Sequence, residues 1–266
     1  MTNLMQRMLS VLGIIVIVTF ALFVREDVFM FLISLLLFFS SIEWMNMLDT
    51  GKFHNICYAI FNVALLLFGI FVDHFWLVAI GVLWWVVGII LLFQYVRKSA
   101  AGVKWSKLTH VVVGAMLLVP SASSIIVLRE FGADILLILL LLVCSVDAGG
   151  YFVGKKYGAN KLMPLISPAK TIEGSLGGVV LAIILTIAAY YIIPIDSFGL
   201  LEIILMSLFI AIFAILGDLF ESMVKRRFGI KDSGNVIPGH GGLLDRIDSF
   251  TAAAPPFALL LLFTPF

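Results

Sequence analysis

Long apolar runs dominate this chain and restrict its fold more than any other feature. Of its 266 residues, 62% are hydrophobic and 12% are charged, with a mean hydropathy of +1.18, which is more apolar side chain than a soluble domain hides. A helix needs about 20 mostly apolar residues to cross a bilayer. Runs that approach or reach this length occur at 9–24, 28–47, 56–72, 75–96, 109–128, 132–152, 175–194, 200–221 and 247–265. The sequence therefore predicts an all-α, polytopic integral membrane protein with about nine transmembrane helices.

The distribution of Lys and Arg predicts how these helices are oriented. With the N-terminus in the cytoplasm, 15 of the 17 Lys and Arg fall on inner segments, and only Arg25 and Arg129 fall outside. Such an excess of cations is typical of cytoplasmic loops. The first run looks like a signal peptide but lacks a small-residue cleavage site before Arg25, so we expect a retained span. We predict a multi-pass protein of the inner, or plasma, membrane with a cytoplasmic N-terminus and an external C-terminus.

The segment 222–248 is polar in an otherwise apolar chain. It concentrates cations, carboxylates, a histidine and glycines. Charged groups are costly in a membrane protein, so they gather where the chain does chemistry or moves a solute. Lys and Arg suit phosphate groups, and separated Asp residues suit a hard divalent cation that bridges phosphate oxygens. The segment therefore indicates a phosphate-binding site, and the predicted orientation puts it on the cytoplasmic side.

The end of the eighth span carries a polar stripe. Offsets of three, four and seven residues put its members on one helix face. They are Asp218, Glu221, Ser222 and Lys225. Asp218 follows an apolar run and would cost up to about 2.5–3.5 kcal/mol at the bilayer centre, which favours a functional role. Lys225 is also explained by the basic residues expected at an inner membrane boundary.

Asp245 and Asp248 stand one helical turn apart at the start of the ninth span, beside Arg246. An acid at a helix N-terminus caps free N–H groups and complements the helix dipole, which explains one of the two but not both together with Arg246. With Asp218 they suit a Mg²⁺ ion on a polyphosphate, since Mg²⁺ usually takes one or two protein carboxylates. The sequence leaves open which of the three bind directly.

The connector between these two helices is rich in glycine. Gly241 and Gly242 let backbone N–H groups approach a phosphate closely, but such a loop is equally a plain connector. Lys231 and Asp232 lie in the same connector. For His240 three roles are open: a general base, a hydrogen-bond donor to phosphate, or a structural residue that forms hydrogen bonds within the protein.

A second polar cluster precedes the seventh span. Asp147 closes the sixth span, and Ser167, Lys170 and Glu173 follow on the same predicted side of the membrane. Lys170 either neutralises phosphates or meets anionic lipid headgroups, a contact worth about 1 kcal/mol. Glu173 is also explained as an acid at a helix N-terminus. The cluster supports the phosphate-binding site without deciding it.

The polar groups gather in the C-terminal half of the chain, which suggests a division of labour. We predict an N-terminal transmembrane region, 1–130, for packing, lipid access and dimer contacts, and a catalytic transmembrane region, 131–266. Glu43, inside the second span, is the exception. An ion-pairing role and a substrate-access role are both open for it.

These segments together resemble the signature of the phosphatidate cytidylyltransferases, or CDP-diacylglycerol synthases. The matching residues are, in order, Ser167-Pro-Ala-Lys170-Thr-x-Glu173-Gly, Ser222-x-x-Lys225-Arg226, Lys231-Asp232, Pro238-x-His240-Gly-Gly and Asp245-Arg246-x-Asp248. The resemblance is specific over roughly 140–250 and extends elsewhere only to length and span number. Gly150 is a mild departure, because a small residue such as Ala is expected there.

The resemblance implies an integral membrane enzyme, a homodimer, that makes CDP-diacylglycerol and pyrophosphate from CTP and phosphatidate. It implies Mg²⁺, leaves a second metal ion open, and implies a polar cavity that faces the cytoplasm. The implied catalytic residues are Asp218, Lys225, Arg226, Asp245, Arg246 and Asp248, with Asp218, Asp245 and Asp248 as metal ligands. The implied substrate-binding residues are Asp147, Ser167, Lys170, Glu173, Ser222, Lys231, Asp232, His240, Gly241 and Gly242.

Such a reaction needs charge neutralisation more than a strong base. The phosphate of the lipid is already an anionic nucleophile, so the main obstacle is repulsion between two polyanions. A metal ion and cationic side chains around the reacting phosphates offset that repulsion. We therefore expect His240 to orient a substrate or donate a proton.

Two other functions remain open from the sequence. A CTP-dependent polyprenol or phytol kinase would need the same cations, metal and membrane setting. An ion-coupled transporter would use Asp218 as an ion ligand beside a broken helix, but matching interrupted spans are not seen in the two halves of the sequence. The lipid bilayer is an expected partner, and we expect no nucleic acid.

Overall fold

Long helices make up most of the structure. The computed structural model describes residues 23–97, 105–193, 198–234 and 241–264. Over these residues the helices are α2 Glu26–Asn46, α3 Lys52–Val72, α4 His74–Arg97, α5 Lys107–Phe131, α6 Ala133–Tyr157, α7 Ile172–Ile192, α8 Leu200–Arg227 and α9 Leu244–Leu262. The two strands are β1 Lys161–Met163 and β2 Ser167–Thr171.

The helices confirm the predicted all-α, polytopic membrane protein. Seven of those in the described ranges, α2 to α8, are long and apolar enough to cross a membrane. Helix α9 also forms where a ninth span was predicted, but three charged residues within its first five keep it out of that group. The first predicted span, 9–24, lies almost wholly outside the described residues, so the total of about nine stays a prediction.

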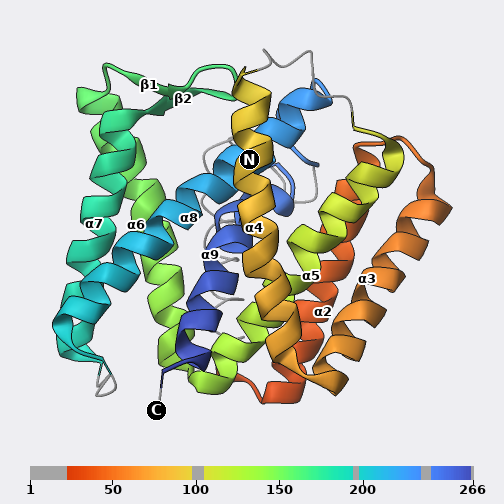
Figure 1. The fold of residues 1–266 in the computed structure, drawn as a ribbon, viewed down its shortest axis with the longest axis horizontal. Helices are drawn as coiled ribbons and strands as arrows, with labels where there is room; N and C mark the ends of the chain where they lie inside the picture. Colours follow the sequence, from red (N-terminus) through yellow and green to blue (C-terminus); the bar gives the residue numbers. More distant parts are fainter. Residues whose placement is uncertain (1–22, 98–104, 194–197, 235–240, 265–266) are drawn as a thin grey trace, which may run out of the picture.

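Helix α9 lies in the middle of the bundle, with α2 to α5 on one side and α6 to α8 on the other (Figure 1). It packs against α8, α5 and α4. Its central part, Ala252–Ala254, carries only methyl side chains and is fully buried, which lets neighbouring backbones come close. Helix α9 therefore contacts helices of both predicted regions, 1–130 and 131–266, and both help to hold its polar start in place.

Among the described helices, α6 and α7 share the most extensive contact. Gly149 in α6 faces Gly177 and Gly178 in α7, and a Cβ on Gly149 would lie 2.8 Å from the Gly177 carbonyl oxygen and the Gly178 Cα. Small residues at such a contact allow two transmembrane backbones to pack directly. This contact holds the end of α6 that carries Asp147 against the start of α7.

A short antiparallel hairpin, β1 and β2, joins α6 to α7 at one end of the bundle (Figure 1). Three contacts hold it in place. Glu173 accepts hydrogen bonds from the backbone N–H groups of Ala159 and Asn160. The Thr171 side chain caps α7 by accepting a hydrogen bond from Gly174 N. Arg226 Nε donates to Ile166 O at 3.2 Å. The hairpin was not predicted, because strands of three and five residues leave too short a pattern to read.

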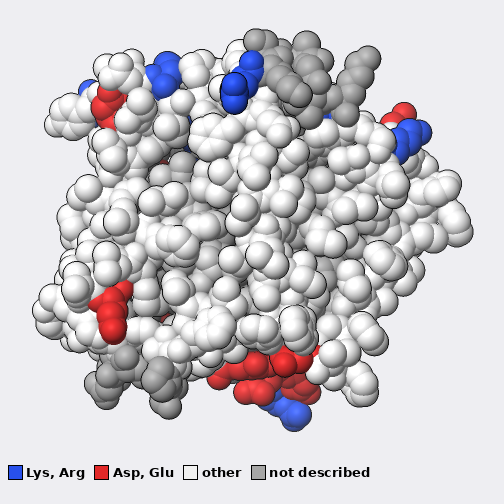
Figure 2. All heavy atoms as spheres, in the orientation of Figure 1, with Lys and Arg blue, Asp and Glu red and all other residues white. Residues whose placement is uncertain are grey.

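The two ends of the bundle differ in charge. On the face that Figure 2 shows, basic side chains lie mainly at the hairpin end, where some acidic ones also appear, and the largest acidic patch lies at the opposite end beside a basic side chain. Helices α2, α4, α6 and α8 run toward the hairpin end, and α3, α5, α7 and α9 run away from it (Figure 1). This alternation agrees with the predicted topology, while the assignment of the hairpin end to the cytoplasm stays a prediction.

Candidate active site

A polar cavity of about 330 Å³ opens at the hairpin end of the bundle. Residues from α6, β2, α7, α8 and α9 line it: Asp147, Gly150, Tyr151, Ala169, Lys170, Thr171, Ser175, Asp218, Asp245 and Asp248. Its polar character follows from where the apolar runs stop. Asp147 and Asp218 follow long apolar stretches of α6 and α8, and α9 carries Asp245 and Asp248 in its first turns, so the three helices bring carboxylates to one cavity.

Carboxylates crowd this cavity. Asp147, Asp218 and Glu221 are all close enough to Asp248 to interact with it electrostatically. Glu221 is only 2% exposed, and neither of its carboxylate oxygens accepts a hydrogen bond from the described residues. The Nζ of Lys225 lies 3.4 Å from Glu221 Oε2. Carboxylates gathered this closely repel one another when they are ionised. A bound cation would offset that repulsion.

Lys170 forms an ion pair with Asp218 and so ties the hairpin to α8. Both side chains are 24% exposed, which places the pair at the edge of the cavity. Ser222 Oγ donates to the other oxygen of Asp218 at 3.2 Å. Asp218 is therefore held between its own helix and strand β2.

Asp245 organises the start of α9. Its Oδ1 accepts a hydrogen bond from Lys225 Nζ at 2.6 Å, and its Oδ2 accepts from Gly242 N at 2.8 Å and Ser233 N at 3.0 Å. Hydrogen bonds to an ionised group are stronger than those between neutral groups. Lys225 thus bridges Glu221 and Asp245, and Asp245 joins α8, α9 and the segment after α8 into one unit.

Other predicted site residues lie beside the cavity without lining it. Arg226 donates to the carbonyl oxygens of Ile166 and Ile230, and Glu173 holds the base of the hairpin, so both fasten the hairpin end. Arg246 is exposed and close enough to Asp147 to interact with it electrostatically. Ser167 opens β2 opposite Met163.

The remaining predicted site residues lie in the segments on either side of 235–240. Lys231 and Asp232 are exposed, and Gly241 has a φ of +88°, in the region that favours glycine. Gly242 is buried, and a Cβ there would lie 2.7 Å from Glu43 Oε2. His240 lies outside the described residues.

Two further acids belong to this neighbourhood although they were not among the predicted site residues. Glu221 lies in the polar stripe of α8, and its helical spacing from Asp218 was the signal that could have selected it. Glu43 comes from α2, and its only signal was a charge inside an apolar run. Sequence spacing carries no information about such a contact between distant helices.

The donor chemistry of the cavity suits a magnesium ion shared with a phosphate. Within 23–97, 105–193, 198–234 and 241–264, no three Asp, Glu, His or Cys side chains are arranged to enclose a metal ion by themselves. Mg²⁺ does not require such a cage, because it usually takes one or two carboxylates and completes its shell with water and phosphate oxygens. Asp147, Asp218 and Asp248 lie in one open cavity and can supply these carboxylates.

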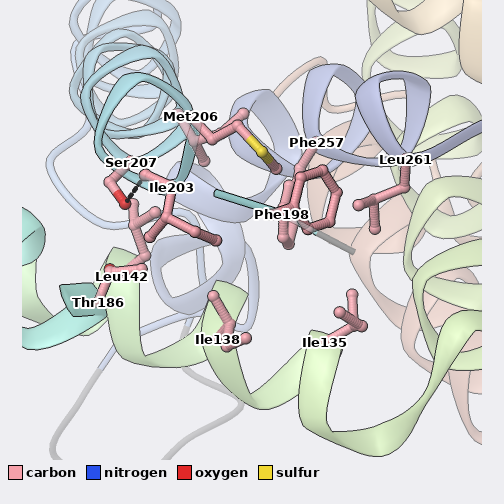
Figure 3. Close-up of a pocket in the computed structure, with 11 residues that line it drawn as sticks. Ile135, Ile138, Leu142, Thr186, Phe198, Ile203, Met206, Ser207, Phe257 and Leu261 are labelled. Atoms are coloured by element: carbon pink, nitrogen blue, oxygen red, sulfur yellow. Dashed lines mark hydrogen bonds between the residues drawn. The ribbon is translucent and has the colours of Figure 1, made fainter. Parts of the chain in front are cut away.

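A second pocket in the bundle lacks this chemistry (Figure 3). It has a volume of about 20 Å³, room for roughly one water molecule, and its lining is almost wholly apolar. The two hydroxyls that line it, on Thr186 and Ser207, donate to carbonyls of their own helices. This pocket has no charged group for binding phosphate, in contrast to the polar cavity.

Comparison with known proteins decides the family. The model of the cytidylyltransferase family matches residues 5–264. The chain belongs to this family. As a member it is an enzyme, a nucleotidyltransferase, and the resemblance noted in its sequence is confirmed.

Curated relatives of this cytidylyltransferase are called phosphatidate cytidylyltransferase. The protein of Pseudomonas aeruginosa is 36% identical over 185 residues, which cover 68% of this chain and 67% of the relative. The Haemophilus influenzae protein is 36% identical over 208 residues, 73% of this chain and 71% of the relative. The Bacillus subtilis protein is 45% identical over 136 residues, about half of each chain.

Proposed function

We propose that this cytidylyltransferase transfers the CMP group of CTP to phosphatidate, making CDP-diacylglycerol and pyrophosphate for phospholipid biosynthesis. The observation that carries the proposal is the cavity at one end of the bundle, where carboxylates from α6, α8 and α9 meet two lysines. Relatives at 36–45% identity that are called phosphatidate cytidylyltransferase support this substrate pair.

The reaction exchanges one bond to phosphorus for another. A phosphate oxygen of phosphatidate attacks the α-phosphorus of CTP, and the bond from that phosphorus to the oxygen bridging to the β-phosphorus breaks. Pyrophosphate leaves with the electron pair. The attacking oxygen is already anionic, so we assign no residue of the cavity as a general base. The main task of the side chains is to hold two polyanions together in line.

Asp218, Asp245 and Asp248, with Asp147 beside them, would hold the magnesium ion. When bound, Mg²⁺ neutralises negative charge on the triphosphate and on the leaving pyrophosphate. A second metal ion would find further carboxylate oxygens in the same cavity.

We assign phosphate binding to Lys170 and Lys225, because both contact carboxylates of the cavity. Lys170 pairs with Asp218, and Lys225 pairs with Asp245 at 2.6 Å. When a polyphosphate binds, each lysine would exchange its carboxylate partner for a phosphate oxygen, and the freed carboxylate would be available to hold the metal ion. Ser222 and Arg246 lie next to these groups and complete the set.

The location of the cavity fits its two substrates. It lies at the hairpin end of the bundle, which the distribution of cations assigns to the cytoplasm, where CTP is found. Phosphatidate of the inner leaflet would bring its headgroup to the same level. A homodimer remains an expectation from the resemblance.

Purified protein in detergent, supplied with CTP and Mg²⁺, should release pyrophosphate only when phosphatidate is present, and CDP-diacylglycerol should form in equal amount. A chelator should stop the release, and added Mg²⁺ should restore it. Release of CDP with a phosphorylated alcohol, when polyprenol or phytol is supplied, would replace the proposal with the kinase. Solute uptake into vesicles without CTP turnover would replace it with a transporter.

A further inference from the structure

Glu43 is the most deeply buried acid of the N-terminal helices. It lies near the end of α2 that faces the hairpin, and it is only 2% exposed. Within the described residues, no Lys, Arg or His nitrogen lies within 4 Å of its carboxylate oxygens. A buried charge without an ionic partner must be stabilised by hydrogen bonds and dipoles instead.

That stabilisation comes from the start of α9. Glu43 Oε1 accepts a hydrogen bond from Leu243 N at 2.9 Å, and Oε2 accepts from Leu244 N at 2.9 Å and from Ser233 Oγ at 3.2 Å. Helix α9 has no capping side chain of its own at Leu243. Glu43 therefore caps α9 from another helix, 201 residues away, and its charge complements the positive end of the helix.

The carboxylate fits between two glycines. A Cβ on Gly234 would lie 2.8 Å from Glu43 Oε1, and a Cβ on Gly242 would lie 2.7 Å from Oε2. Neither position has room for a larger residue. The glycine at 242, which the sequence suggested for a close approach to phosphate, has the additional role of making room for Glu43.

Contacts with α5 hold α2 in place beside the start of α9. The next residue, Trp44, donates from Nε1 to His110 O at 2.9 Å, and His110 Nε2 lies 2.9 Å from Trp44 O. The two rings also stack, with their centroids 4.6 Å apart. The position of Glu43 is thus set by packing between α2 and α5.

The turn that Glu43 caps is the turn that carries the catalytic carboxylates. Asp245 accepts from Gly242 N and Ser233 N, so Glu43 and Asp245 both hold the segment that contains Ser233 and the start of α9. We infer that Glu43 is a positioning residue: it fixes the first turn of α9, and with it Asp245 and Asp248, relative to Asp218. This inference rests on the proposed function and extends the site into the N-terminal region.

The test compares Glu43→Gln with Glu130→Gln, a matched change at the other end of the bundle. Gln keeps the size of Glu but turns an NH₂ group toward one of the N–H groups of α9. In Glu43→Gln we expect turnover per folded molecule to fall about tenfold to a hundredfold, with little change in the KM for CTP, because small misplacements of reacting groups act mainly on the rate. Glu130→Gln should keep the native rate.

Hydrogen exchange provides a readout that does not depend on turnover. Amides of 242–248 should exchange faster in Glu43→Gln and at the native rate in Glu130→Gln. A native turnover per folded molecule in Glu43→Gln, with only a lower melting temperature, would make the contact merely structural and overturn the inference. If Glu43→Gln does not fold, Ser233→Ala removes one of the three hydrogen bonds, and unchanged turnover and exchange in that variant would also overturn it.

Failure of the proposed function gives a different result. In that case the native protein releases no pyrophosphate with CTP, Mg²⁺ and phosphatidate. Faster exchange of 242–248 in Glu43→Gln would then still show that Glu43 holds this turn, whereas unchanged exchange would refute the clamp as well.

Discussion

The bundle has an acidic cavity at each end, and the two differ in how their charges are held. The hairpin-end cavity, about 330 Å³, is lined by carboxylates that converge from three helices. The opposite cavity, about 230 Å³, is lined by Glu26, Asp27 and Glu130, which come from helix ends. There, Asp27 pairs with Arg25 at the exposed surface, and Glu130 lies 3.5 Å from His74.

The difference shows that acidic residues alone do not make a site. At the opposite end, each acid has a local partner or faces water, where charges are screened and cost little. At the hairpin end, the acids are close to one another, and lysines from β2 and α8 reach in among them. Of the two cavities, only this one brings together the carboxylates and lysines that the proposed magnesium ion and polyphosphate would need. The following variants test that contrast.

Replacing Asp218 by Asn should have the largest effect. It removes the charge that pairs with Lys170 and that the proposed metal ion would use, so turnover should fall by more than about a hundredfold. The protein should still insert and elute as the native protein does in size-exclusion chromatography. Asp27→Asn is the matched change at the opposite end and should keep native pyrophosphate release. Near-native turnover of Asp218→Asn would remove this residue from the metal site.

Replacing Lys170 by Ala should have the next largest effect. The variant loses a cation for the polyphosphate, which we expect to lower kcat/KM for CTP by about tenfold to a hundredfold, since a hydrogen bond to a charged group contributes about 1.5–3 kcal/mol. Steady-state kinetics with varied CTP measure this. Arg25→Ala, which breaks an exposed ion pair, should leave kcat/KM unchanged. Equal kinetics of the two variants would contradict the phosphate role of Lys170.

Replacing Gly242 by Ala should have an intermediate effect. The added Cβ collides with the Ser233 side chain and crowds Glu43, so unfolding in detergent should become easier by about 1–3 kcal/mol. Turnover per folded molecule should fall as well, because the turn that carries Asp245 moves. Gly199→Ala, at the opposite end, meets only Glu202 Oε2 at 3.9 Å and should cost less than about 1 kcal/mol. Equal stabilities would argue against the tight fit around Glu43.

Replacing Glu130 by Gln should have the smallest effect. Its contact with His74 lies at a partly exposed helix end, where ion pairs contribute about 0–1 kcal/mol. Melting temperature and turnover should both stay close to those of the native protein. A large loss of turnover in this variant would mean that the two acidic ends are functionally linked, and the contrast drawn above would fail.

The positions of the spans could be read from the sequence because apolar periodicity is a local property. The helices from α2 to α8 match runs predicted at nearly the same residues, and α9 begins within a few residues of its prediction. Asp218, Asp245 and Asp248 stood out for a similar reason, since a charge at the edge of an apolar run is visible without knowing the fold.

The contacts among these residues depended on the tertiary structure. Their sequence separation is large and carries no periodic signal, so only the packing of α6, α8 and α9 brings Asp147 to the same cavity as Asp218 and Asp248. The ion pair of Lys170 with Asp218 needed a hairpin too short to predict. The capping of α9 by Glu43 needed a helix from the other end of the chain. The sequence by itself determined where the apolar helices lie and that charged residues cluster in 222–248, because these are local properties, and its motifs carried the resemblance to the cytidylyltransferases. The tertiary structure decided which of those residues face one another, because that depends on how distant helices pack.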